Sequence, residues 1–516
     1  MFVNRRSFLS GIVGAAGLSA LGSSIRVAPV LASTSPTGLA ADPRRPQFHL
    51  LPAANWMNDP NAPIFFNDRY HMFYQYNPDG AFWGDMHWGH AVSTDMVHWQ
   101  HLPVALAPTP GGPDADGCFT GTAAVLDGKV TIFYTGVRSA PEEQATSKDG
   151  SHSLLETQCL ASAEDSELKV WTKLPAPVIA APPAGMQVNG FRDPSPWRQG
   201  NTWYMTIGTG IANRGGAVLL YKSKDLRNWE YMHVLARRNQ NGATTLDAFD
   251  PWEVWECPEF FALGDRHVLI YSTAGKGYWQ SGRLDSEIMR FHPEQAGILD
   301  YGSYYAAKTQ LDKSGNRILW GWIPEARPVE EHKAAGWAGL MSLPRVLTLG
   351  TDGRLRSRVA AEVNQLRGRE QAVAIGAEES GNLRQINALR IEDCCGEIVC
   401  TAKRTHEPFE FALESAGGGT QWIRVKYDPL QPGQVTIDAR PAPVLLGEND
   451  DLELHLYIDS SVIEVFVNQQ AAWTKRVYPS GNTPQAMRVQ WTGKTANIVS
   501  LSAWQMTPIS ANRLSA

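Results

Sequence analysis

The 516-residue sequence predicts an all-β protein in which a five-bladed β-propeller is followed by a C-terminal β-sandwich. Three observations support this fold class. Strand–turn–strand units recur five times in the first 350 residues, a Ser-x-Asp motif with a Trp four residues later follows two of them, and apolar and polar residues alternate cleanly in the last third of the chain. A chain of this length has room for two or three domains with sizeable cores.

Each recurring unit consists of two apolar segments joined by a polar turn, as at Asn67-Asp68 and Asp127-Gly128, which is the pattern of a β-hairpin. The five units span residues 64–76, 123–134, 197–207, 260–271 and 306–322. Their spacing of about 45 to 75 residues suits blades of four strands. The innermost strands of a propeller converge on one axis, so we expect residues that open different blades to become neighbours there.

The predicted propeller covers residues 44–350 and the predicted sandwich covers residues 372–510. Within the sandwich, residues 452–458 and 462–467 alternate as strands with one buried face do. This region has no cluster of candidate catalytic residues, which indicates a structural role. The segment 351–371 between the domains is expected to be a linker with a short polar helix over 354–369.

The first 32 residues are typical of an export signal. The twin-arginine motif Arg5-Arg6-Ser7-Phe8-Leu9 precedes an apolar stretch rich in Gly and Ala, and small residues around Ala32 suit cleavage after that position. We expect export of the folded protein to the periplasm or the outside, with no stable membrane association after cleavage. A general secretion signal or an uncleaved anchor is the alternative.

Composition narrows the choice of partner. The net charge is −6 and no basic stripe occurs, which argues against nucleic acid. The 18 Trp residues suit stacking on sugar rings, although most of them are expected in the core. Six Cys residues give no disulfide framework, so we expect buried thiols, with one bridge among the last three as an open alternative.

Three carboxylates occur in the same local setting at distant places: Asp59 in Asn58-Asp59-Pro60, Asp193 in Arg192-Asp193-Pro194, and Glu256 in Glu256-Cys257-Pro258. Each lies one or two residues before a proline and opens an apolar strand. Two carboxylates that face each other across a sugar are the equipment of a glycosidase, and a third can hold sugar hydroxyls. Asp59 could instead form an Asx turn, and Glu259 is a rival to Glu256.

A second pattern imitates a zinc site, since His87-x2-His90 is followed by His98-x2-His101. Packing around the interleaved Trp residues is the alternative, and we expect neither a metal nor an organic cofactor. Trp320 and Trp322 share one face of a strand, where they either line the pocket or fill the blade.

Together these motifs resemble those of glycoside hydrolase family 32, in family order and over nearly the whole chain after the signal. The motifs are Trp56-Met57-Asn58-Asp59-Pro60-Asn61, Phe73-Tyr74-Gln75-Tyr76-Asn77-Pro78, Trp83-Gly84, Phe119-Thr120-Gly121, Arg192-Asp193-Pro194, Glu256-Cys257-Pro258, Trp337-Ala338-Gly339, Ser342-Leu343-Pro344-Arg345 and the sandwich signature from Asp459 to Phe466. One departure is Ala62, where the family usually has Gly. There we expect a small backbone adjustment without loss of activity.

The resemblance implies a retaining β-fructosidase that acts on sucrose, inulin or levan. It assigns Asp59 as the nucleophile, Glu256 as the acid/base and Asp193 as the residue that binds fructose hydroxyls and stabilises the transition state. It implies that the fructose subsite is lined by Asn58, Gln75, Trp83, Phe119, Thr120 and Arg192. Glu256 must be protonated when it acts, so we expect a mildly acidic pH optimum.

Three other functions remain open on the sequence. A fructosyltransferase would share the covalent intermediate, an arabinan- or xylan-cleaving enzyme on the related fold would invert configuration, and an inactive propeller would only bind carbohydrate. The three carboxylates argue against the inactive protein. Substrate preference, exo or endo action, and oligomeric state do not follow from the motifs.

Overall fold

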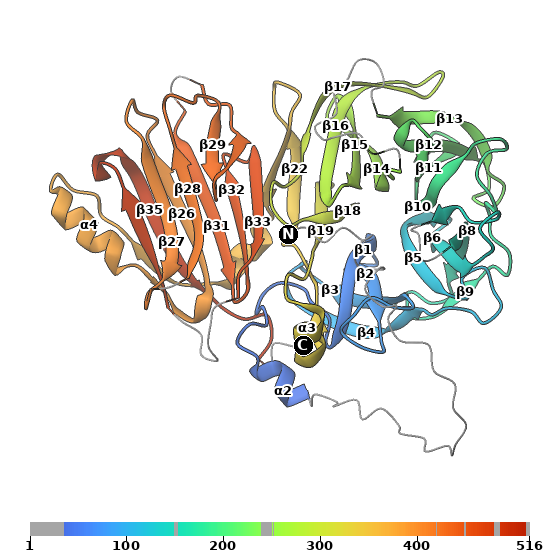
Figure 1. Cartoon of the computed structure of the whole chain (residues 1–516), viewed down its shortest axis with the longest axis horizontal. Helices are drawn as coiled ribbons and strands as arrows, with labels where there is room; N and C mark the ends of the chain where they lie inside the picture. The colour runs from blue at the N-terminus through green and yellow to red at the C-terminus, as the bar shows by residue number, and fades with distance from the viewer. Residues whose placement is uncertain are drawn as a thin grey trace, which may run out of the picture.

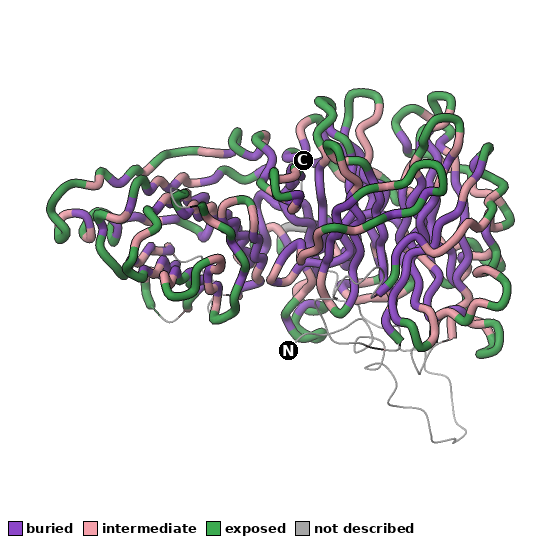
Figure 2. The backbone as a smooth tube through the Cα atoms, turned by 90° about the horizontal axis from the view of Figure 1, so that it is seen from above, coloured by how far each residue is buried: buried purple, intermediate pink, exposed green. Residues whose placement is uncertain are grey.

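The structure is a computed structural model that describes residues 36–148, 153–238, 250, 252–418, 420–447, 450–478 and 486–511. Its two domains lie side by side, with the propeller blades around one axis and the sandwich packed against one flank (Figure 1). Buried backbone runs through both domains and across the junction between them (Figure 2). The predicted fold class is confirmed.

Five antiparallel sheets form the blades. The first blade contains β1 (Asn55–Phe66), β2 (Arg69–Asn77), β3 (His87–Ser93) and β4 (Trp99–Leu106); the second contains β5 (Gly117–Leu126), β6 (Lys129–Ser139), β7 (Ser147–Lys148), β8 (Ser153–Ala163) and β9 (Trp171–Lys173). The third contains β10 (Val188–Gln199), β11 (Thr202–Ile211), β12 (Gly215–Ser223) and β13 (Glu230–Arg237); the fourth contains β14 (Glu256–Leu263), β15 (Arg266–Thr273), β16 (Lys276–Asp285) and β17 (Arg290–Ile298). The fifth contains β18 (Tyr305–Leu311), β19 (Arg317–Ile323), β21 (Leu340–Met341), β22 (Arg345–Leu349) and β23 (Leu355–Val359).

The five predicted hairpins are the first two strands of the five blades, paired in register around the predicted turns. Every opening strand also has an irregularity that the sequence did not reveal. The pairing register shifts between Met57 and Pro60 in β1, and at the corresponding place in the other four opening strands. A bulge twists a strand and redirects the side chains within it. All five opening strands therefore redirect their side chains at the same level.

A short strand joins the fifth blade to the first. β20 (Trp337–Ala338) pairs in parallel with the start of β1, and helix α3 (Val329–Ala335) leads into it. The next residue, Gly339, has φ +78°, and a Cβ there would lie 1.9 Å from the carbonyl oxygen of Met57. Only glycine fits this close approach, so the Trp-Ala-Gly motif holds the strand that carries Asp59.

The second domain is a sandwich of two six-stranded sheets. The first contains β24 (Arg367–Ala372), β35 (Ile498–Met506), β26 (Cys395–Ala402), β31 (Leu452–Asp459), β32 (Val462–Val467) and β33 (Ala471–Arg476). The second contains β25 (Arg390–Ile391), β34 (Met487–Thr492), β27 (Phe409–Ser415), β28 (Gln421–Tyr427), β29 (Gln434–Ile437) and β30 (Arg440–Pro443). The described residues also form helices α2 (Pro36–Ala41) and α4 (Glu379–Ala388) and the 3-10 turns Glu392–Cys394 and Thr495–Asn497.

The prediction of a helix over residues 354–369 is wrong. This segment contains the last strand of the fifth blade, β23, then the 3-10 turn Ala361–Leu366 and the start of β24. Leu355 and Val359 are buried, whereas Arg356 and Ser357 are partly exposed and Arg358 is exposed. β23 pairs with β22 along its length. Tertiary strand pairing outweighs the helical appearance of this polar sequence.

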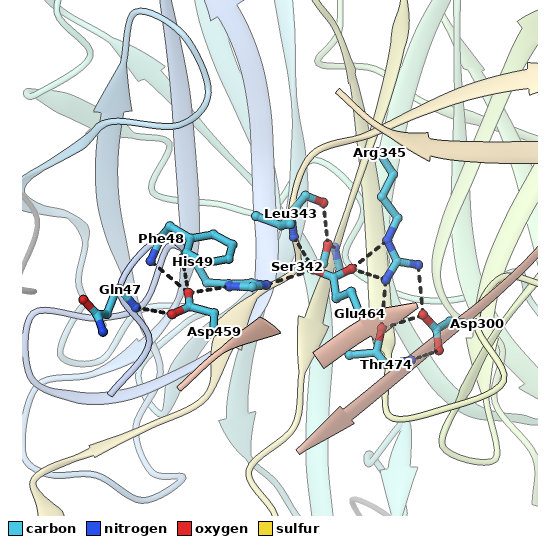
Figure 3. Close-up of polar contacts among 11 residues, drawn as sticks. Gln47, Phe48, His49, Asp300, Ser342, Leu343, Arg345, Asp459, Glu464 and Thr474 are labelled. Atoms are coloured by element: carbon cyan, nitrogen blue, oxygen red, sulfur yellow. Dashed lines mark hydrogen bonds and ion pairs between the residues drawn. The ribbon is translucent and has the colours of Figure 1, made fainter. Parts of the chain in front are cut away.

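The sandwich docks on the propeller through buried polar side chains (Figure 3). Asp459 accepts hydrogen bonds from the backbone N–H groups of Gln47, Phe48 and His49 at 2.6, 2.8 and 3.0 Å. The His49 ring lies 2.8 Å from Asp459 and 3.0 Å from Glu464. The sandwich signature thus binds the segment that precedes β1 through hydrogen bonds.

Three further expectations concern the export signal, the membrane and the cysteines. The signal segment 1–32 lies outside the described residues. No helix among the described residues is long and apolar enough to cross a membrane. All six Cys residues are buried, and Cys118, Cys159 and Cys400 are free thiols.

Candidate active site

The three carboxylates that the sequence singled out converge around one residue, Cys257. Its backbone N–H donates to Asp193 Oδ2 at 2.7 Å, and its thiol lies 3.6 Å from Asp59 Oδ2. Glu256 immediately precedes it on β14. Asp59, Asp193 and Glu256 come from the opening strands of the first, third and fourth blades, and all three are buried. The propeller therefore brings together residues that are 134 and 63 positions apart in the sequence.

Backbone conformation explains this convergence. Asp193 and Cys257 lie within the bulges of their strands and have φ values of 66° and 51°, in the left-handed region. Residues other than glycine seldom adopt this conformation, so its recurrence beside the cluster marks strain held by the surrounding sheet. A regular strand would alternate these side chains between opposite faces, whereas the bulges turn them toward the common axis.

Asp59 is held by two neutral donors. Thr120 Oγ1 donates to Asp59 Oδ2 at 2.6 Å, and Asn58 Nδ2 donates to Oδ1 at 2.9 Å. Asn58 is fixed in turn by the indole N–H of Trp56, which donates to its side-chain oxygen at 2.7 Å. These contacts fix the orientation of the Asp59 carboxylate, as a group that must attack one carbon atom requires.

Glu256 is held between a cation and a phenol. Arg192 donates to Glu256 Oε1 through Nε at 3.2 Å and through Nη2 at 3.0 Å. The hydroxyl of Tyr305 donates to the other oxygen, Oε2. Sequence reasoning missed Tyr305, although it opens the fifth hairpin as the three carboxylates open theirs; no proline follows it to signal the position.

The crowding of negative charge in this cluster affects the pKa of Asp193. Burial raises the pKa of Asp193 to about 6, and the negative charges of Glu256 and Asp59 act in the same direction, while Arg192 and Lys308 oppose them. An acid whose charge is disfavoured by its neighbours is characteristic of a functional site. Crowded carboxylates of this kind can stabilise a developing cation.

The other predicted subsite residues lie beside the cluster. Trp83 and Phe119 are partly buried, with ring centroids 6.1 Å apart at 72°, and they pack on a group that includes Trp56, Tyr305 and Trp322. Gln75 donates to the backbone oxygen of Cys118 at 2.9 Å, which places it behind the Phe119-Thr120 segment. The aromatic group forms an apolar wall next to the three carboxylates.

Trp320 does not belong to this wall. Its ring packs on Trp99 at 5.6 Å in the core between the fifth and first blades, whereas Trp322 lies 6.0 Å from Trp56 near the axis. Of the two Trp residues on β19, Trp322 therefore lines the apolar wall and Trp320 fills the core of the blade.

The rival carboxylate, Glu259, is part of a buried ion pair. Lys308 Nζ lies 3.1 Å from Glu259 Oε1, and hydroxyl groups of Ser195 and Thr309 donate to Glu259 at 2.9 Å each. Such complete pairing is typical of a structural carboxylate. The bulge in β14 lies between Glu256 and Glu259, so the two carboxylates are at opposite ends of it.

The four His residues of the zinc-like pattern contact different partners: His87 contacts Asp85, His90 contacts His71, His98 contacts Asp95, and His101 contacts Tyr74 and Leu51. Throughout the described part of the chain, no three His, Cys, Asp or Glu side chains are grouped so as to hold a metal ion.

Comparison with known proteins gives the family. Residues 49–358 match the glycosyl hydrolases family 32 N-terminal domain, and residues 362–505 match the glycosyl hydrolases family 32 C-terminal domain. The chain is 35% identical to sucrose-6-phosphate hydrolase of Escherichia coli over 84% of this chain and 89% of that protein. It is 34% identical to raffinose invertase of Escherichia coli over 85% and 90%.

Comparison with solved structures supports the same family. The β-fructofuranosidase of Bombyx mori superposes with a TM-score of 0.72 at 28% identity, covering 91% of this chain and 96% of the other. Fructan 1-exohydrolase IIa of Cichorium intybus superposes with a TM-score of 0.73 at 25% identity, covering 90% and 98%. The chain therefore belongs to glycoside hydrolase family 32 and is a glycoside hydrolase of the β-fructofuranosidase type.

Proposed function

We propose that the protein is an exported, retaining β-fructosidase that releases terminal β-D-fructofuranosyl units from sucrose or fructans through a covalent fructosyl-enzyme intermediate. The observation that carries this proposal is the convergence of Asp59, Asp193 and Glu256 on one residue, Cys257, at the propeller axis. Two carboxyl groups held at close range are the requirement of double displacement.

The reaction follows from the position of each group. Asp59, fixed by Thr120 and Asn58, attacks C2 of the fructosyl unit while Glu256 donates its proton to the departing oxygen, so that the C2–oxygen bond breaks as the ester forms. Glu256 then takes a proton from water, which attacks C2 and releases fructose and Asp59. Asp193 holds fructose hydroxyls and stabilises the oxocarbenium-like transition state.

Two kinds of substrate fit this reaction. Relatives include a raffinose invertase and a fructan 1-exohydrolase of Triticum urartu, which is 34% identical over 67% of this chain and 60% of that protein. Sucrose, inulin and levan all present a terminal fructosyl unit, which the wall of Trp83 and Phe119 beside the carboxylates would receive.

The test is the release over time of fructose, and of glucose or glucose 6-phosphate, from sucrose, sucrose 6-phosphate, inulin and levan, with Asp59→Asn as the control. Equal fructose and glucose from sucrose, absent in the control, supports a hydrolase and ranks the substrates. An excess of glucose over fructose would mean that fructosyl units are transferred to sugars, and the protein would then be a fructosyltransferase and not a hydrolase. No release from any substrate would refute the proposed function.

Retention is tested separately by following the anomeric configuration of newly released fructose by NMR. A β-anomer as the first product supports the covalent intermediate. An α-anomer would mean direct attack by water and would contradict the role proposed for Asp59.

Export rests on the twin-arginine motif at Arg5 and Arg6. In the producing cell, we expect activity in the periplasm or medium and a mature N-terminus after Ala32. Replacement of both arginines by Lys should leave the activity in the cytoplasm. Unchanged export of that variant would exclude the twin-arginine route.

A further inference from the structure

A fourth buried carboxylate lies next to the cluster, and none of the sequence motifs includes it. Glu156 is on β8 in the second blade and is fully buried. Its Oε2 accepts hydrogen bonds from the backbone N–H of Phe191 at 2.6 Å and from the hydroxyl of Thr146 at 3.1 Å. The Glu156 N–H donates back to Thr146 Oγ1 at 2.9 Å, so the residue is fixed at both its backbone and its side chain.

The other oxygen of the Glu156 carboxylate, Oε1, accepts a hydrogen bond from Arg192. Arg192 Nη1 donates to Glu156 Oε1 at 2.6 Å, while Nε and Nη2 of the same guanidinium bind Glu256 at 3.2 and 3.0 Å. One planar cation is thus shared by two carboxylates from different blades. Gly190 leaves the necessary space, since a Cβ there would lie 3.0 Å from Nη1.

This sharing resolves a conflict in the reaction. A guanidinium beside Glu256 favours the ionised form of that carboxyl, yet a general acid must carry its proton when the substrate arrives. Tyr305 from β18 and Asp193 from β10 also face Glu256, and Asp59 from β1 and Lys308 from β18 act on Asp193. The carboxylate of Glu156 is positioned to offset the charge of Arg192 directly.

We propose that Glu156 is a positioning residue for the acid/base step: it holds Arg192 in the plane that orients Glu256, and its charge compensates the guanidinium so that Glu256 keeps its proton. The inference rests on the proposed function, because it concerns the acid step of that reaction. Glu156 acts only through Arg192 and does not contact the substrate.

The test is the pH dependence of kcat/KM on sucrose for the wild type, Glu156→Gln and Glu156→Asp. The Gln variant keeps the shape and removes the charge, so Arg192 should favour ionised Glu256 and move the alkaline limb about one pH unit lower. The Asp variant keeps the charge but withdraws it by one methylene, so its limb should move the same way and by less. It also keeps the test available if the Gln variant does not fold.

The matched control is Glu397→Gln in the sandwich, which removes a buried carboxylate that also binds an arginine, Arg367, through both oxygens. Its alkaline limb should coincide with that of the wild type. Limbs of both Glu156 variants that coincide with the wild type, with kcat/KM lowered equally at every pH, would mean a purely structural role and would overturn the proposal. Wild-type protein that releases no fructose would overturn the proposed function instead, before any variant is compared.

Discussion

Two clusters of buried carboxylates, one at the junction of the domains and one at the propeller axis, have their charge compensated in different ways. At the junction of the domains, each carboxylate contacts a cation: His49 lies between Asp459 and Glu464, and Arg345 lies between Glu464 and Asp300, 2.9 Å from the latter (Figure 3). Burial opposes ionisation there, but these cations outweigh it and hold the pKa of Glu464 at about 2.

At the propeller axis, by contrast, Asp59 and Asp193 are held by hydroxyl, amide and backbone donors, and the pKa of Asp193 rises to about 6. Because its folded pKa lies above the usual 3.8, the stability of the fold decreases as pH rises from 3.8 through about 6. The junction therefore uses carboxylates to stabilise the fold, whereas the axis maintains like charges in proximity at a cost in stability, as a site that stabilises a cation requires. Substitutions in the two clusters should separate these effects.

The largest expected effect is that of Asp59→Asn on catalysis. Removal of the nucleophile should lower kcat on sucrose about 10,000-fold. Because the substitution also removes one of the crowded charges, the midpoint of thermal unfolding should stay the same or rise. Steady-state kinetics and calorimetry measure the two quantities. A large loss of stability would contradict the comparison, since Asp59 would then behave like a junction carboxylate.

Glu464→Gln should have the opposite signature. It leaves Arg345 and His49 each with one carboxylate partner in a fully buried setting, which should lower the free energy of unfolding by about 3–5 kcal/mol. The activity of each folded molecule should be retained. Urea unfolding together with active-site titration tests this expectation. Glu410→Gln, at the partly exposed pair with Arg424, is the control and should shift the midpoint little.

The same junction should make stability depend on pH. Although burial opposes its charge, hydrogen bonds to Asp459 and Glu464 raise the pKa of His49 to about 9, above its unfolded value of 6.5. Its contribution is therefore complete below pH 6.5 and is lost as pH rises through 9, by up to about 3 kcal/mol. The contribution of Glu464 is present above pH 4.5 and is lost as pH falls through 2.

Urea unfolding at intervals between pH 6 and 10 measures the loss on the alkaline side. His49→Gln should be less stable than the wild type at pH 6 and should lack most of the decline between pH 6.5 and 9. A wild-type stability that stays constant across this window would show that His49 is not held as a cation at the junction.

The contrast between the clusters also explains what the sequence could predict. The hairpins were predictable because turn residues and apolar runs are local signals, and three carboxylates stood out because each precedes a proline. The bulges were not predictable, since they arise from pairing between strands, and Tyr305 was missed with them. Glu156 reaches the site from β8, a strand that does not open a blade, through Arg192. Local sequence carries no sign of such a contact.

The smallest expected effect concerns Ala62, where the family usually has Gly. Ala62 has φ 41° within a second register shift of β1, between Asn61 and Ile64, and its methyl group is buried among apolar side chains. A left-handed alanine costs about 1–2 kcal/mol relative to glycine, while the buried methyl returns about 0.8 kcal/mol. Ala62→Gly should therefore change the free energy of unfolding by about 1 kcal/mol or less, in the stabilising direction, with kcat unchanged. A clear destabilisation in urea would mean that packing of this methyl, and not backbone strain, decides the residue here.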